Sequence, residues 1–147
     1  MGQIARQLVF KAPLEKVWGI WADIENYPKW VDGVQESKIT SSIRIGKGLR
    51  WQEKCLFEIG GLLAVEHEIR EWEAGKRVVI QTELPMNGQM SRSVQFYSRK
   101  DTTEVGIDMK WDLGLAEAII GAEPLRQMLE KSLEKTSSNW KAQAECP

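Results

Sequence analysis

The fold is decided by the stretch Ala12-Pro13-Leu14-Glu15-Lys16-Val17-Trp18, which lies near the start of the chain. Pro13 suits the first position of a helix, because its fixed φ is helical and its missing N–H needs no partner there. Val17, Trp18 and Trp21 recur at the spacing of a buried helical stripe. The stretch therefore predicts a short helix with an apolar face.

A second motif follows directly, Asp23-Ile24-Glu25-Asn26-Tyr27-Pro28-Lys29-Trp30. Asn26 is placed to cap a second, shorter helical turn that is entered through Pro28. Trp30 closes the unit, which ends near Gly33. We expect two short helices in succession.

The residues on either side of this unit alternate between apolar and polar, as in half-buried strands. Gln3–Phe10 precedes the unit, and about six such segments follow it, beginning with a weak, polar strand at Glu36–Ile45. From about Pro124 to Ala144 the period becomes that of an amphipathic helix. The predicted order, within one domain spanning residues 1–147, is a strand, two short helices, about six antiparallel strands and a long helix.

This order resembles that of the polyketide cyclase/dehydrase and START-like proteins, the helix-grip superfamily that includes the birch-pollen allergen. The motifs that carry the resemblance are Ala-Pro-x-x-x-Val-Trp at residues 12–18 and Tyr-Pro-x-Trp at residues 27–30. The resemblance covers essentially the whole chain and implies an α+β helix-grip fold, in which a curved antiparallel sheet of about seven strands wraps round the C-terminal helix. It also implies a cavity between sheet and helix, but it specifies fold far better than function.

The composition excludes several other classes of protein. The chain has 147 residues, of which 42% are hydrophobic and 28% charged, as in ordinary globular domains. Lys and Arg number 20 against 21 for Asp and Glu, and without a basic stripe a nucleic-acid partner is disfavoured. Cys55 and Cys146 form no C-x-x-C pair, so disulfide, redox and zinc motifs are absent. Without a secretory signal or an apolar run of membrane length, we expect a cytoplasmic protein with no stable membrane insertion; its oligomeric state is left open.

The inner face of the predicted sheet, together with the long helix, would line the cavity that the resemblance implies. Such a wall favours an apolar or aromatic ligand. The residues expected to contact it are Trp51, Glu53, Phe57, His67, Ile69, Ile80, Met90, Arg92, Phe96, Met109, Trp111, Leu125, Met128 and Leu129. Trp51 and Trp111 are the candidates to stack on the ligand. The alternative is that these residues simply fill a solid core.

Three polar residues share that predicted inner face: Glu53, His67 and Arg92. A buried charge must be paired, hydrated or functional, because its desolvation costs on the order of several kcal/mol. Glu53 and Arg92 are a candidate ion pair, and His67, the only histidine, is a candidate hydrogen-bond donor or general base. The alternative is a structural role at a wet cavity mouth, or a register shift that puts all three outside.

No metal or cofactor is predicted. Glu66 and Glu68 flank His67, but neighbours on a strand face opposite sides and cannot converge on one ion. No dinucleotide fingerprint or nucleophile elbow occurs.

The sequence favours a carrier or sensor of a small hydrophobic molecule, such as a lipid, isoprenoid, quinone or polyketide-like aromatic. The first alternative is an aromatase/cyclase-like enzyme in which His67, Glu53 and Arg92 enolise or dehydrate a polyketide. The second is an adaptor that resembles the activator of the heat-shock chaperone ATPase. Leu115, Ile119 and Ile120, ahead of the long helix, could form an apolar gate or a transient membrane contact, or a packed first turn.

Overall fold

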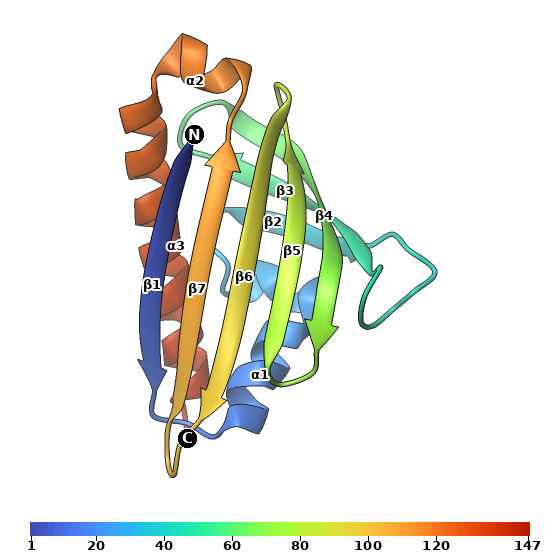
Figure 1. The fold of residues 1–147 in the computed structure, drawn as a ribbon, viewed down its shortest axis with the longest axis vertical. Helices are drawn as coiled ribbons and strands as arrows, with labels where there is room; N and C mark the ends of the chain where they lie inside the picture. Colours follow the sequence, from blue (N-terminus) through green and yellow to red (C-terminus); the bar gives the residue numbers. More distant parts are fainter.

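Seven antiparallel strands form one curved sheet that wraps round a long C-terminal helix in the computed structural model, which describes residues 1–147 (Figure 1). In chain order the elements are β1 Gly2–Phe10, α1 Leu14–Ala22, the 3-10 helix η1 Ile24–Lys29, β2 Val34–Ile39, β3 Arg50–Phe57, β4 Gly61–Glu73, β5 Arg77–Leu84, β6 Gly88–Ser98, β7 Thr103–Asp112, α2 Leu115–Ile120 and α3 Ala122–Ala144. The strand order is β1-β7-β6-β5-β4-β3-β2, so the first two strands of the chain lie at opposite edges. The predicted helix-grip fold is confirmed.

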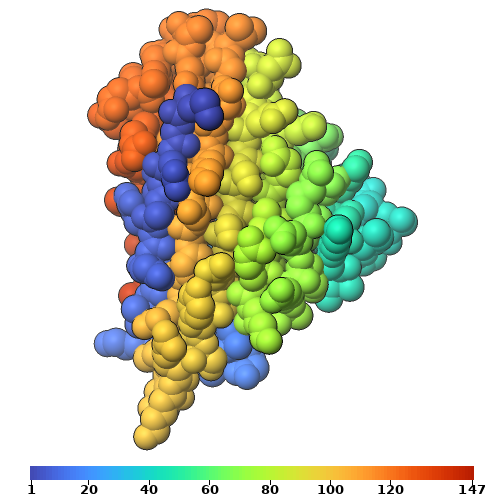
Figure 2. Space-filling model, viewed as in Figure 1, coloured from blue at the N-terminus to red at the C-terminus, as the bar shows by residue number.

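The sheet is buried on one face only. Along β7 the side chains alternate between the core and the solvent, and Val105, Ile107, Met109 and Trp111 are buried. No helix covers the opposite face, which forms a continuous surface with the β6–β7 turn projecting from one end (Figure 2). One-sided burial is the reason why the alternating pattern is so clear in the sequence.

The two short helices differ from the prediction in their first residues. Pro13 has an extended conformation and is the residue before α1, not its first helical residue. Asn26 lies inside η1, where its side chain donates a hydrogen bond to the carboxylate of Asp23, the residue before the helix. The prediction that Asn26 caps this turn was therefore wrong, because Asp23, an equally suitable capping type, starts the turn earlier.

Two other elements have different bounds from those predicted. β2 ends at Ile39 rather than at Ile45, because the Ser41 hydroxyl accepts a hydrogen bond from the Arg50 N–H and donates one to the Ile43 carbonyl, which bends the chain out of the strand. The apolar segment before the long helix forms α2, between Gly114 and Gly121.

An aromatic cluster fills the end of the molecule where α1 and the C-terminal part of α3 meet the sheet. The ring of Trp140 lies 4.8 Å from that of Phe10 and 5.3 Å from that of Trp30. The Trp18 ring lies 5.1 Å from that of Phe96. Close, tilted ring contacts of this kind leave no space for a ligand at this end.

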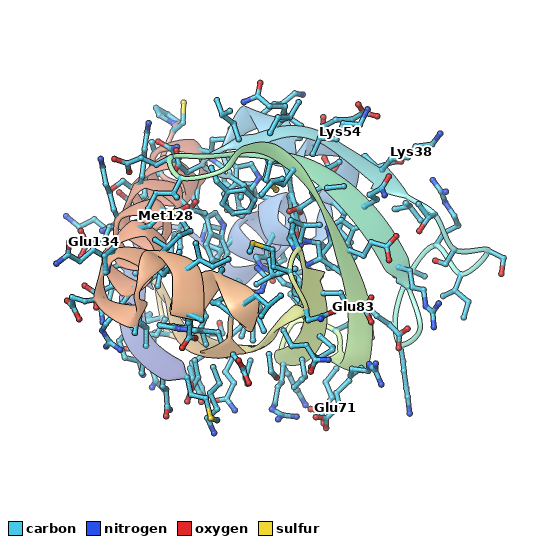
Figure 3. The ribbon with its side chains drawn as sticks, turned by 90° about the horizontal axis from the view of Figure 1, so that it is seen from above. Lys38, Lys54, Glu71, Glu83, Met128 and Glu134 are labelled. Atoms are coloured by element: carbon cyan, nitrogen blue, oxygen red, sulfur yellow. The ribbon has the colours of Figure 1, made fainter.

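Seen from above, the sheet curves round α3, with Lys38 and Lys54 directed to the outside and side chains filling much of the space between (Figure 3). None of the helices has the length and apolar character needed to span a bilayer. The space that the aromatic cluster does not fill lies beside the middle of α3.

Candidate functional site

A cavity of about 760 Å³ lies between the inner face of the sheet and the middle of α3. Of its 24 lining residues, 12 are hydrophobic. Met90, Met109 and Met128 are among them, and methionine side chains are flexible and polarizable enough to follow ligands of different shape. The volume lies within the range of small-molecule sites.

The cavity opens between the loop at residues 31–35, the tip of the β3–β4 hairpin and α3. Two exposed ion pairs bridge this mouth to α3: Glu58 lies 3.5 Å from Lys131, and Asp32 lies 3.5 Å from Lys135. The Asp32 N–H also donates to the Thr136 hydroxyl at 2.9 Å. The mouth is therefore held by polar contacts that water can replace.

The segment considered as a gate does not line this cavity. Leu115, Ile119 and Ile120 belong to α2, which lies beyond the end of the sheet, and none of them contributes to the lining. Ile119 is 70% exposed. The gate interpretation therefore stays a prediction, because these residues do not line the cavity.

The residues expected to contact a ligand divide into two groups. Those that line the cavity are Glu53, Phe57, His67, Met90, Arg92, Met109, Met128 and Leu129. Those that lie outside its lining, as buried core residues, are Trp51, Ile69, Ile80, Phe96, Trp111 and Leu125. Phe96 belongs to the aromatic cluster, so the same sheet face is solid at one end and hollow at the other.

The two tryptophans considered for stacking are engaged with protein groups. The Trp51 ring stacks on the His67 ring with centroids 4.7 Å apart, and its indole N–H donates to Glu53 Oε2 at 2.9 Å. The guanidinium of Arg126 lies 5.8 Å from the Trp111 ring. Trp51 therefore packs against His67 and holds the Glu53 carboxylate, and it does not itself line the cavity.

A chain of hydrogen bonds joins four polar side chains on the inner face. His67 Nε2 lies 2.9 Å from Glu53 Oε1, and His67 Nδ1 lies 2.7 Å from the Thr82 hydroxyl oxygen. Arg92 Nη2 donates to His67 Nδ1 at 3.3 Å. We call Glu53, His67, Thr82 and Arg92 the polar cluster.

The donors and acceptors of the polar cluster determine the state of His67. Because a guanidinium has no acceptor, Nδ1 of His67 must accept from Arg92, and the Thr82 hydroxyl donates to the same nitrogen. The ring proton is then on Nε2, which donates to Glu53. Burial lowers the pKa of His67, and the neighbouring charge of Arg92 lowers it further although the carboxylate of Glu53 opposes both. His67 is therefore neutral near pH 7.

Glu53 is ionised inside the fold. Burial alone would raise the pKa of Glu53, but the interactions with His67, the hydrogen bond from Trp51 and the charge of Arg92 outweigh it and lower the pKa to about 2. The thiol of Cys55 lies beside this carboxylate at 3.6 Å, and burial together with the Glu53 charge raises the pKa of Cys55 to about 12.

The expected ion pair between Glu53 and Arg92 does not form, since no oxygen of Glu53 lies within 4.0 Å of an Arg92 nitrogen. Glu53 is on β3 and Arg92 on β6, with β4 and β5 between them, so His67 bridges the gap. Thr82 was not predicted as a member of the cluster. Its position on the inner face of β5, directly opposite His67 in the ladder, was the available signal.

Arg92 has more donors than the protein satisfies. Its single hydrogen bond to another side chain is the one to His67, and its Nε is buried without a partner. No carboxylate lies within 4.0 Å of its guanidinium. Since buried donors are nearly always hydrogen-bonded, an arginine with so few partners beside a cavity is unusual.

No group of three or more His, Cys, Asp or Glu side chains is arranged to hold a metal ion. The site thus combines an apolar, adaptable wall with one cluster of fixed hydrogen-bonding groups. It can hold an apolar molecule and orient one polar group of that molecule.

The fold and the cavity define a helix-grip protein with a hollow between its sheet and its long helix. The family model described as "Polyketide cyclase / dehydrase and lipid transport" matches residues 1–145, and the chain belongs to this family. No curated protein matches the chain in sequence.

Solved structures share the fold at low sequence identity. A START superfamily protein from Mycobacterium smegmatis has a TM-score of 0.81 at 12% identity, with 97% of each chain covered. Ara h 8.0201 has a TM-score of 0.74 at 12% identity, with 96% of this chain and 95% of that chain covered. The Zhui aromatase/cyclase from Streptomyces sp. R1128 has a TM-score of 0.72 at 16% identity, with 97% of this chain and 90% of that chain covered.

Proposed function

We propose that this protein binds a small, largely apolar molecule in the cavity between the sheet and α3. The observation that carries the proposal is a volume of about 760 Å³ that is open to solvent and has hydrophobic residues at half of its lining positions. A solid core would have filled this space, because protein interiors pack as densely as organic crystals. The family description, which includes lipid transport, supports the same function.

Binding is favoured over catalysis because His67 has no free ring nitrogen. Nε2 donates its proton to Glu53, and Nδ1 already accepts from Thr82 and Arg92. A general base must reach the proton that it removes from the substrate. His67 therefore serves to position Arg92 and Glu53.

A second candidate is a polyketide cyclase or aromatase-like enzyme, and Arg92 favours it. A guanidinium that lines the cavity can stabilise the oxygen anion of an enolate. Similarity to the Zhui aromatase/cyclase is consistent with this chemistry. The candidate requires a base other than His67.

The proposal is tested by titration calorimetry with two neutral probes, 1-decanol and 2-naphthol. At least one probe should bind. Met109→Trp, which places a bulky indole ring in the cavity, should weaken the binding of that probe at least tenfold. Ile119→Trp adds the same ring on the exposed face of α2 and should change nothing. If neither probe binds and the protein carries no apolar passenger from its own host in native mass spectrometry, the proposal is wrong.

A further inference from the structure

We infer that the ligand of this cavity carries a carboxylate and that Arg92 binds it. The inference rests on the proposed function, because it names the chemical class of the molecule that occupies the same cavity. The cavity should therefore prefer an amphiphilic acid to neutral alcohols, esters and ketones of the same size.

The charged residues that line the cavity differ in what they contact. Asp32 pairs with Lys135, and Glu58 pairs with Lys131, both at the mouth. Glu53 accepts hydrogen bonds from Trp51 and His67. Arg92 is the remaining charged lining residue, and it contacts no carboxylate and no other acceptor except His67 Nδ1.

The unused donors of Arg92 match a carboxylate better than a carbonyl. A guanidinium has five N–H groups in one plane, and a carboxylate accepts two parallel hydrogen bonds from such a fork. A carbonyl oxygen or a hydroxyl would offer a single acceptor atom and leave more of the guanidinium N–H groups without a partner. A planar ligand group with two oxygens satisfies the most donors.

Glu53 does not fill this role. It lies on the far side of the imidazole, and its oxygens accept from Trp51 and His67. Its negative charge stabilises the guanidinium at a distance, but it offers no acceptor within 4.0 Å. The chain of hydrogen bonds also holds the guanidinium through His67, so the cation is preorganised for an anion.

The rest of the cavity requires an apolar body on the same molecule. Met90, Met109 and Met128 line it together with Phe57 and Leu129. Met128 lies on α3, across the cavity from the sheet (Figure 3). One anionic end and one apolar body complement both parts of the site.

The experiment compares three ligands with the same alkyl chain, decanoate, 1-decanol and methyl decanoate, by titration calorimetry at pH 7.5. The wild-type protein should bind decanoate at least tenfold more tightly than either neutral probe. Arg92→Gln should reduce this preference to threefold or less, mainly by weakening the binding of decanoate. Arg92→Lys, which keeps the charge without the fork, should show an intermediate preference. Arg99→Gln, on an exposed arginine paired with Glu104, is the matched control and should behave as wild type.

The outcomes separate the two proposals. If the wild type binds decanoate no more tightly than the neutral probes, the carboxylate inference is wrong and the proposed function stands. If Arg92→Gln, folded by circular dichroism, keeps the preference, Arg92 is not the anion site and the inference is also wrong. If Arg92→Gln does not fold, the wild-type comparison and Arg92→Lys decide. If none of the three probes binds the wild type, the carboxylate inference is wrong, and 2-naphthol binding and native mass spectrometry then decide whether the proposed function is wrong as well.

Discussion

Lowering the pH from 7.5 to 5.5 should destabilise this protein through one side chain, His67. In the fold His67 is neutral, and burial lowers its pKa from the ordinary value of 6.5. The unfolded chain takes up a proton as the pH falls through that ordinary value, whereas the folded chain takes it up only at lower pH. Stability is therefore fully present above about pH 6.5 and is lost as the pH falls towards the folded pKa.

The size of the effect follows from linkage. A single proton that binds only to the unfolded chain lowers the free energy of unfolding by up to about 1.4 kcal/mol between pH 7.5 and 5.5. Glu53 does not contribute in this range. Its folded pKa is about 2 against an ordinary 4.5, so its stabilisation is present above about pH 4.5 and is lost between there and pH 2.

The assay is urea unfolding followed by tryptophan fluorescence at pH 7.5, 6.5 and 5.5. His67→Gln is the comparison, because its amide can still donate to Glu53 but does not titrate. His67 is the only histidine, so no other imidazole contributes. The wild type should lose stability across the range and the variant should not. An equal loss in both proteins, or a flat wild-type profile, would refute the assignment of a neutral, buried imidazole.

Two further predictions concern backbone strain and thiol burial. Gly114 has a φ of +60°, and a Cβ there would lie 2.6 Å from a backbone oxygen of the β5–β6 loop, so Gly114→Ala should lower the free energy of unfolding by about 1–3 kcal/mol. Gly19 lies on the exposed side of α1, and no atom lies within 4 Å of a Cβ added there, so Gly19→Ala should raise the free energy of unfolding by about 0.5–1 kcal/mol. If urea unfolding shows that the two substitutions change stability in the same direction, this reasoning is wrong. Cys146 is exposed and should react with Ellman's reagent in the native protein, whereas Cys55, whose pKa burial raises to about 12, should react only on unfolding. Cys146→Ser should therefore leave no fast-reacting thiol, and a fast reaction in that variant would place Cys55 at the surface.

The inner-face residues could be predicted because a strand has a period of two. Glu53, His67 and Arg92 each fall in step with apolar neighbours on their strands, and all three line the cavity. The alternation is clear because only one face of the sheet is covered. The order of elements followed from the same change of period, from two in the strands to 3.6 in α3.

The contacts within the site could not be predicted from that pattern. Alternation places a side chain on a face but does not say which side chains on other strands lie beside it. His67 on β4 pairs with Trp51 on β3 and with Thr82 on β5. Because β4 and β5 lie between β3 and β6, Glu53 and Arg92 are too far apart to pair. The extent of the cavity could not be predicted either, because Phe96 and Met109 are equally apolar in the sequence. Aromatic rings of α1 and α3 pack against Phe96, whereas Met109 lines the cavity.

The pairing of β1 with β7 has a consequence for synthesis on the ribosome. Gly2 pairs with Trp111 and Phe10 with Thr103, so the first strand must wait for about 100 more residues before its partner exists. At about 5–20 residues per second the delay is on the order of 5–20 s. During that time the nascent chain carries an apolar segment with free backbone hydrogen-bonding groups, while β2 to β6 can already pair with their neighbours in sequence. The first strand is therefore the segment of this chain that stays without its partner longest during synthesis.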